Sequence, residues 1–168
     1  MSLSFLPSLV AETVTQLTPA YLQQEGIALL MLDFDNTIVP YTTSVPSPEM
    51  EQWLRQMTAS PVRLCVVSNS RKSRVRAFCA HYGIACITHA KKPFSRGIRA
   101  CLAQFQLPPQ ACALAGDQIF TDTLGANCAG VRSILVDAIH NHTFLLKLRG
   151  CLEVPFRLLS RKRTILPR

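Results

Sequence analysis

Long apolar runs are absent from this 168-residue sequence, although 48% of its residues are hydrophobic. No stretch reaches the ~18 apolar residues that a membrane-spanning helix needs. The opening segment, MSLSFLPSLVAETVTQL, has no basic region ahead of an apolar one and no small-residue cleavage motif, so we expect no secretory signal. The composition is typical of a globular protein with one core, and excludes disordered and membrane-spanning classes.

Paired cysteine motifs are also missing. The seven cysteines are an odd number, and no two of them have the C-x-x-C spacing of zinc or redox sites. Most stand in apolar contexts such as RLCVVS and ACALAG. We therefore expect buried, reduced thiols in a cytoplasmic protein, rather than disulfides or a zinc site.

Acidic residues are scarce, ten against 18 lysines and arginines, and the positive excess is uneven. Residues 141–168 carry seven basic side chains and one acid, a net charge of +6, whereas the first 140 residues carry only +2. Because leucine, phenylalanine and isoleucine are interleaved with these cations, the segment suits an anionic surface, either a membrane or a nucleic acid. An ordinary solvated surface is the alternative.

Short apolar runs alternate with amphipathic segments along the middle of the chain. Strands are predicted at 27–34, 62–68, 84–88, 111–117 and 132–138, and helices at 47–57, 70–83, 95–105 and 121–130. This alternation predicts a single doubly wound α/β domain with a parallel sheet of about five strands. We expect a helical lead-in over 1–26, the α/β core over 27–140 and a basic amphipathic tail over 141–168.

Polar side chains follow four of the predicted strands at their carboxyl ends. In chain order they are Asp33 with Asp35, Ser68 with Asn69, Lys91 with Lys92, and Asp117 with Asp122. Ligands bind beyond the carboxyl ends of the strands in such sheets, so these side chains are expected to converge. Asp33 and Asp35 are two positions apart, and carboxylates that close repel each other in a poorly hydrated site. Mg²⁺, which prefers oxygen ligands, would offset the repulsion.

This set of carboxylates, hydroxyl and ammonium groups fits metal-assisted transfer of a phosphoryl group to an aspartate. A divalent cation and a lysine reduce the repulsion between an aspartate nucleophile and an anionic phosphate. A serine hydroxyl binds a remaining phosphate oxygen, and a second aspartate protonates the leaving oxygen. Acids that merely cap loops at the strand ends are the structural alternative.

The motifs DFDNT, SN, KP and GDQIFTD follow one another from Asp33 to Asp122. In this order they resemble the four motifs of the haloacid dehalogenase (HAD) phosphatase superfamily. The resemblance implies a Rossmann-like HAD domain with Asp33 as nucleophile and Asp35 as general acid and base. It also implies Mg²⁺ held by the Asp33 carboxylate, the backbone carbonyl of Asp35, and Asp117.

The same resemblance implies roles for the other motif residues. Phosphate would be bound by Ser68, Asn69 and Lys92, with Lys92 favoured over Lys91 because it precedes the proline. The loops and the metal site would be supported by Asn69, Thr37, Gly116 and Asp122.

No cap domain fits between these motifs. Asp35 and Ser68 are 33 positions apart and Ser68 and Lys92 are 24 apart, and one helix, one strand and short loops use up each interval. An uncapped site is open to solvent and suits a substrate presented on something large, unless oligomerisation supplies a lid. Residues 5–140 are also similar to the YqeG-like branch of HAD subfamily IIIA, which is related to phosphatidylglycerophosphate phosphatases.

That likeness implies Mg²⁺-dependent dephosphorylation of phosphatidylglycerophosphate to phosphatidylglycerol, a step of phospholipid biosynthesis. The basic tail would bind the membrane peripherally, and no nucleic-acid partner is expected. A soluble phosphatase of a small sugar or nucleotide phosphate, or of a nucleic-acid end, is the alternative. A catalytically inactive scaffold is disfavoured because no motif carboxylate is missing.

Overall fold

The computed structural model describes residues 4–70 and 73–139, which form one parallel six-stranded sheet in the order β1-β6-β5-β2-β3-β4. The strands are β1 (Leu9–Val10), β2 (Leu29–Leu32), β3 (Arg63–Val67), β4 (Ala85–Ile87), β5 (Cys112–Gly116) and β6 (Arg132–Leu135). The helices are α1 (Pro19–Gln24), α2 (Pro48–Thr58), α3 (Ser73–Tyr82), α4 (Arg96–Phe105) and α5 (Leu124–Ala129), with short helical turns at Val14–Gln16, Pro109–Ala111 and Ile119–Thr123. The predicted α/β architecture is confirmed, and the described residues contain no inserted cap domain.

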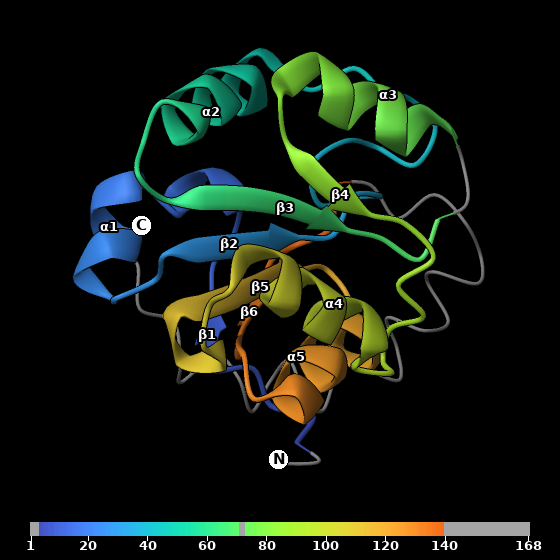
Figure 1. Cartoon of the computed structure of the whole chain (residues 1–168). Coiled ribbons are helices and arrows are strands. Elements are labelled where there is room, and N and C mark those ends of the chain that lie inside the picture. Colours follow the sequence, from blue (N-terminus) through green and yellow to red (C-terminus); the bar gives the residue numbers. More distant parts are fainter. Residues whose placement is uncertain (1–3, 71–72, 140–168) are drawn as a thin grey trace.

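Helices cover both faces of this sheet, α2 and α3 on one side and α4 and α5 on the other (Figure 1). Strand β2 lies between β3 and β5 and is buried throughout. Leu30 and Leu32 belong to the core under α2 and α3, whereas Leu29 and Met31 belong to the core under α4 and α5. A strand covered on both faces needs apolar residues at every position, which explains the continuous apolar run.

Local sequence signals set the helix boundaries. Ser47 caps α2, because its Oγ accepts a hydrogen bond from the Met50 amide at 3.2 Å, and Pro48 occupies the first turn. Helix α3 ends before Gly83, whose φ of +66° favours glycine. Both boundaries agree with the sequence-based prediction.

The lead-in differs from the expected helical segment over 1–26. It contributes the strand β1, and of its described residues, 4–26, only α1 and the turn at Val14–Gln16 are helical. Because β1 pairs with β6, the sheet has six strands rather than about five. A two-residue strand is too short to show a hydrophobic period, so the sequence pattern could not reveal it.

The predicted tail at 141–168 lies outside the described residues. Within the described ranges, no helix is both long enough and apolar enough to cross a membrane.

Candidate active site

Four buried charged side chains meet where β2, β4 and β5 end. The ammonium Nζ of Lys92 lies 2.7 Å from Asp33 Oδ1 and 2.7 Å from Asp122 Oδ1. Carboxylate oxygens of Asp33, Asp117 and Asp122 all lie within 4.8 Å of one another. The exposed fraction of each of these four residues is 6% or less. The parallel sheet therefore brings together side chains from three of the four predicted motifs.

Burial and the neighbouring charges shift the pKa values of Asp122 and Lys92. Burial raises the pKa of Asp122 to about 6, because desolvation and the nearby charge of Asp33 outweigh the opposing effect of Lys92. Burial alone would lower the pKa of Lys92, but Asp122 and Asp33 outweigh it and hold that pKa above its usual value. The Lys92 ammonium thus stays charged between its two carboxylates.

The donor set of this cluster fits a divalent cation. With all groups ionised, three carboxylates against one ammonium leave two negative charges in a buried place, which a divalent ion would balance. Carboxylate oxygens are hard ligands of the kind that Mg²⁺ prefers. Asp33 and Asp117, two predicted metal ligands, lie in this set, and Asp122 also offers its carboxylate there.

The loop that follows β2 turns tightly at Asn36, where φ is +63° and the amide donates to the Val39 carbonyl at 2.7 Å. Asparagine tolerates this left-handed conformation better than most residues. The turn directs Thr37 towards the cluster, where its Oγ1 donates to Asp117 Oδ1 at 3.5 Å. Thr37, which was predicted to support the site, is thus hydrogen-bonded to one of its carboxylates.

The loop that follows β3 holds the segment that carries Lys92. The Asn69 side chain donates through Nδ2 to the Lys92 carbonyl at 2.9 Å and accepts the Lys92 amide through Oδ1 at 2.7 Å. Ser68 is buried, and its Oγ accepts a hydrogen bond from the Ser70 amide at 3.0 Å. Lys91 is exposed, so Lys92 is the lysine that lies in the site. Asn69, which was predicted to bind phosphate, makes both of these hydrogen bonds to the Lys92 backbone with its side-chain amide group.

Arg74 is a charged residue of the site that the sequence did not predict. Arg74, in the first turn of α3, forms an ion pair with Asp35 and donates to the Thr43 carbonyl. The Asp35 carboxylate is therefore held by Arg74, and the metal-ligand cluster of carboxylates does not include it. The sequence does contain a signal for this ion pair, the run of basic residues between 71 and 76. Cations are disfavoured at the start of a helix unless an anion faces them, so this run indicates a nearby carboxylate.

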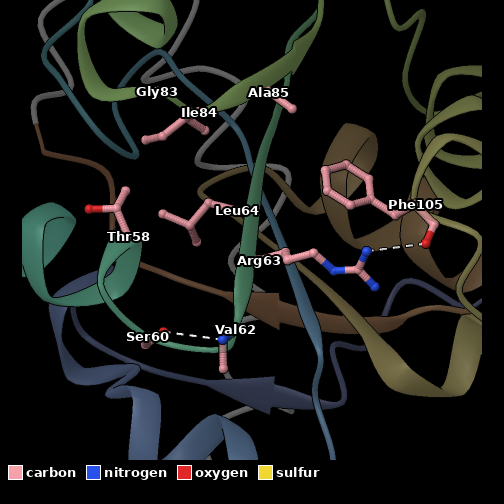
Figure 2. Close-up of a pocket in the computed structure, with 9 residues that line it drawn as sticks. All are labelled: Thr58, Ser60, Val62, Arg63, Leu64, Gly83, Ile84, Ala85 and Phe105. Atoms are coloured by element: carbon pink, nitrogen blue, oxygen red, sulfur yellow. Dashed lines mark hydrogen bonds between the residues drawn. The ribbon is translucent and has the colours of Figure 1, made fainter.

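A separate hollow of about 250 Å³ lies at the opposite edge of the sheet, beside the start of β3 and β4 (Figure 2). Among the described residues that line it, Arg63 is the one with a charge. Arg63 donates to the Phe105 carbonyl at 3.3 Å, and its Cζ lies 5.2 Å from the centroid of the Phe105 ring. None of the described residues that line this hollow is a carboxylate, so they do not provide the groups that phosphoryl transfer needs.

Solved structures share this fold at low sequence identity. A HAD-superfamily hydrolase from Ehrlichia chaffeensis matches with a TM-score of 0.52 and 14% identity, over 76% of this chain and 98% of that one. A cobalt-bound deoxy-D-mannose-octulosonate 8-phosphate phosphatase from Haemophilus influenzae matches with a TM-score of 0.53 and 12% identity, over 81% and 92%. These likenesses show a HAD-like fold, and with the sequence comparisons that follow they define a HAD-type phosphatase.

Sequence comparisons identify the family of HAD-type phosphatases to which the chain belongs. The chain is 30% identical over 132 residues to "Probable phosphatase YqeG" of Bacillus subtilis strain 168. The matched region covers 79% of this chain and 77% of that protein. A family model described as "Mitochondrial PGP phosphatase" matches residues 2–139. The chain belongs to this family of phosphatidylglycerophosphate (PGP) phosphatases. The resemblance found in the motifs is thereby confirmed.

Gly116 ends β5 at a point where a Cβ atom would lie 2.3 Å from Asp122 Oδ2. We predict that Gly116→Ala displaces Asp122 and lowers Mg²⁺ affinity and activity by about 10- to 100-fold. Calorimetric titration with Mg²⁺ and hydrolysis of p-nitrophenyl phosphate measure the two effects. Gly26→Ala is the control for lost stability alone, since the φ of +70° there disfavours alanine while a Cβ meets nothing within 4 Å. Equal metal affinity in both variants would contradict the packing argument.

Proposed function

We propose that this phosphatase is a Mg²⁺-dependent phosphomonoester hydrolase that works through a phosphoryl-Asp33 intermediate. The supporting observation is the contact of Lys92 with both Asp33 and Asp122 inside a cluster of three carboxylates. Asp33, Asp117 and the backbone carbonyl of Asp35 would hold the metal, with Asp122 beside them. When bound, the metal would offset the negative charge of the phosphoryl group.

The reaction has two chemical steps, and the same residues of the chain act in both. Asp33 attacks phosphorus, the bond to the leaving oxygen breaks, and Asp35 gives that oxygen its proton. Water then attacks the phosphorus of phosphoryl-Asp33, and Asp35 takes up a proton from that water. Inorganic phosphate leaves and Asp33 is restored. In both steps Ser68 and Lys92 bind the phosphate oxygens that do not react, and Asn69 holds Lys92 through its backbone.

We further propose phosphatidylglycerophosphate as the substrate, on the basis of membership in the PGP phosphatase family. A cavity of about 500 Å³ borders the site at Thr37 and has room for part of a substrate beyond the phosphate. Apolar side chains, among them Val14, Ile38 and Met50, line much of it. Three acidic residues also line it, and they favour hydroxyl groups over a second phosphate inside the cavity.

Exposed apolar side chains support presentation of the substrate on a lipid surface. In the described part of the chain, the exposed large apolar residues are Tyr41, Val45, Phe94 and Ile139, between 38% and 73% exposed. All four lie on segments that follow β2, β4 or β6, at the edge where the charged cluster lies. Apolar groups at the rim of a site suit an interface with lipid. A soluble phosphatase of a small phosphoester remains the alternative function.

Asp33→Asn is predicted to abolish turnover and leave the fold intact, because an amide is a poor nucleophile towards phosphorus. We expect kcat for p-nitrophenyl phosphate to fall by several orders of magnitude, with an unchanged circular dichroism spectrum. Glu25→Gln makes the same chemical change at a residue that pairs with Arg132, and it should retain activity. Near-normal activity of Asp33→Asn would exclude Asp33 as the nucleophile.

Removal of divalent metal should stop the reaction. After dialysis against EDTA, we expect activity to be lost, and Mg²⁺ to restore it more fully than Zn²⁺, because the site offers only oxygen ligands. The measurement is hydrolysis of p-nitrophenyl phosphate before chelation, after chelation and after each addition. Full activity in the chelated protein would rule out the metal site.

The basic tail should dock the enzyme on anionic membrane. Each cation near such a surface contributes about 1 kcal/mol, so changing Arg161, Lys162 and Arg163 to glutamate should weaken sedimentation with phosphatidylglycerol vesicles. Hydrolysis of vesicle-borne phosphatidylglycerophosphate should fall, whereas hydrolysis of soluble p-nitrophenyl phosphate should stay nearly unchanged. An equal fall in both activities would indicate a structural tail. Unchanged vesicle binding would favour the soluble phosphatase.

A further inference from the structure

The side chain of Arg74 makes four contacts beside the reacting groups, yet the mechanism above gives it no part. Its Nη2 is paired with Asp35 Oδ1, and its Nη1 donates to the Thr43 carbonyl. The guanidinium carbon Cζ lies 5.1 Å from the ring centroid of Phe34 and 5.8 Å from that of Tyr41. The exposed fractions of the Arg74 and Asp35 side chains are 18% and 16%, so this pair is largely shielded from water.

These contacts fix the orientation of the Asp35 carboxylate. Phe34, Asp35, Tyr41 and Thr43 all belong to the segment between β2 and α2, and Arg74 joins them to the first turn of α3. With Oδ1 occupied by the guanidinium, Oδ2 is the oxygen left to exchange a proton. A carboxylate without such a partner would rotate among several positions, and loss of orientation is costly in a proton-transfer step.

We propose that Arg74 is a positioning residue that holds Asp35 in the orientation needed to protonate the leaving oxygen. This inference rests on the proposed general-acid role of Asp35. As the bond between phosphorus and the leaving oxygen breaks, the proton on Oδ2 of Asp35 passes to that oxygen, while Oδ1 stays paired with Arg74. The guanidinium keeps its own protons, since arginine does not deprotonate in proteins, and therefore is not itself the acid.

Three roles for Arg74 make different kinetic predictions. A group that binds the substrate phosphate directly would raise KM for every phosphoester. A merely structural residue would lower activity on all substrates by the same factor. A residue that positions the general acid matters most when the leaving group needs a proton. An alkoxide leaving group needs a proton, whereas p-nitrophenolate leaves without one. Comparing substrates with these two leaving groups therefore distinguishes the three roles of Arg74.

The experiment compares kcat/KM for glycerol 3-phosphate and for p-nitrophenyl phosphate in Arg74→Ala, Asp35→Asn and the double variant. This quantity reports the steps up to phosphorylation of Asp33, in which the leaving group departs. We expect Arg74→Ala to lose about 100-fold on glycerol 3-phosphate and less than about 3-fold on p-nitrophenyl phosphate. The double variant should be no slower than Asp35→Asn, since both changes remove one function.

Two further variants make the result decisive. Arg76→Ala removes the same charge from the same helix, where Arg76 is exposed and donates to Thr88 Oγ1 at 3.2 Å, and it should slow neither substrate selectively. Arg74→Gln keeps a planar side chain and serves if Arg74→Ala fails to fold. An equal loss on both substrates in the folded Arg74 variants, or independent losses in the double variant, would overturn the proposal. If Asp35→Asn itself slows both substrates equally, the general-acid role of Asp35 fails, and the role of Arg74 fails with it.

Discussion

The ammonium of Lys92, buried between Asp33 and Asp122, is the contact on which the rest of the site depends. It joins the segments that follow β2, β4 and β5, and removal of one partner from such a buried pair typically costs about 3–5 kcal/mol. Two neighbouring residues, Asn69 and Gly116, help to position the groups that make this contact. Asn69 fixes the backbone of Lys92, and the missing side chain of Gly116 gives Asp122 its place.

The sheet concentrates this polarity at one edge. Among the described residues, every buried charged side chain lies in a segment beyond the carboxyl end of a strand, and Ser133 of β6 is the one buried polar residue within a strand. Two sets of charges result there. Lys92 organises the carboxylates that would hold a metal, and Arg74 holds Asp35 apart from them. Each of the two aspartates of DFD is therefore paired with a cation of its own, which suits the different roles proposed for them.

Hydrophobic pattern and motif position were enough to predict the core strands and the convergence of Asp33, Lys92 and Asp117. Other features depend on information that a local pattern does not contain. Strand β1 has two residues and no measurable period. The side of α3 that faces the loop after β2 depends on tertiary packing, so Arg74 could not be paired with Asp35. The choice of Lys92 over Lys91, by contrast, was made from the sequence by its place before the proline, and in the structure Lys91 has a φ of +56° and is exposed.

Chemical trapping of phosphoryl-Asp33 tests the proposed chemistry most directly. The Asp35→Asn variant should accept the phosphoryl group of p-nitrophenyl phosphate, whose leaving group needs no proton, but should hydrolyse the intermediate slowly because the base is gone. Acid quenching followed by borohydride reduction converts an acyl phosphate to an alcohol, which mass spectrometry of the peptide locates. The proposed mechanism predicts this reduction at position 33 alone, and none in the protein that also carries Asp33→Asn. Reduction at another aspartate, or none while p-nitrophenolate is still released, would contradict it.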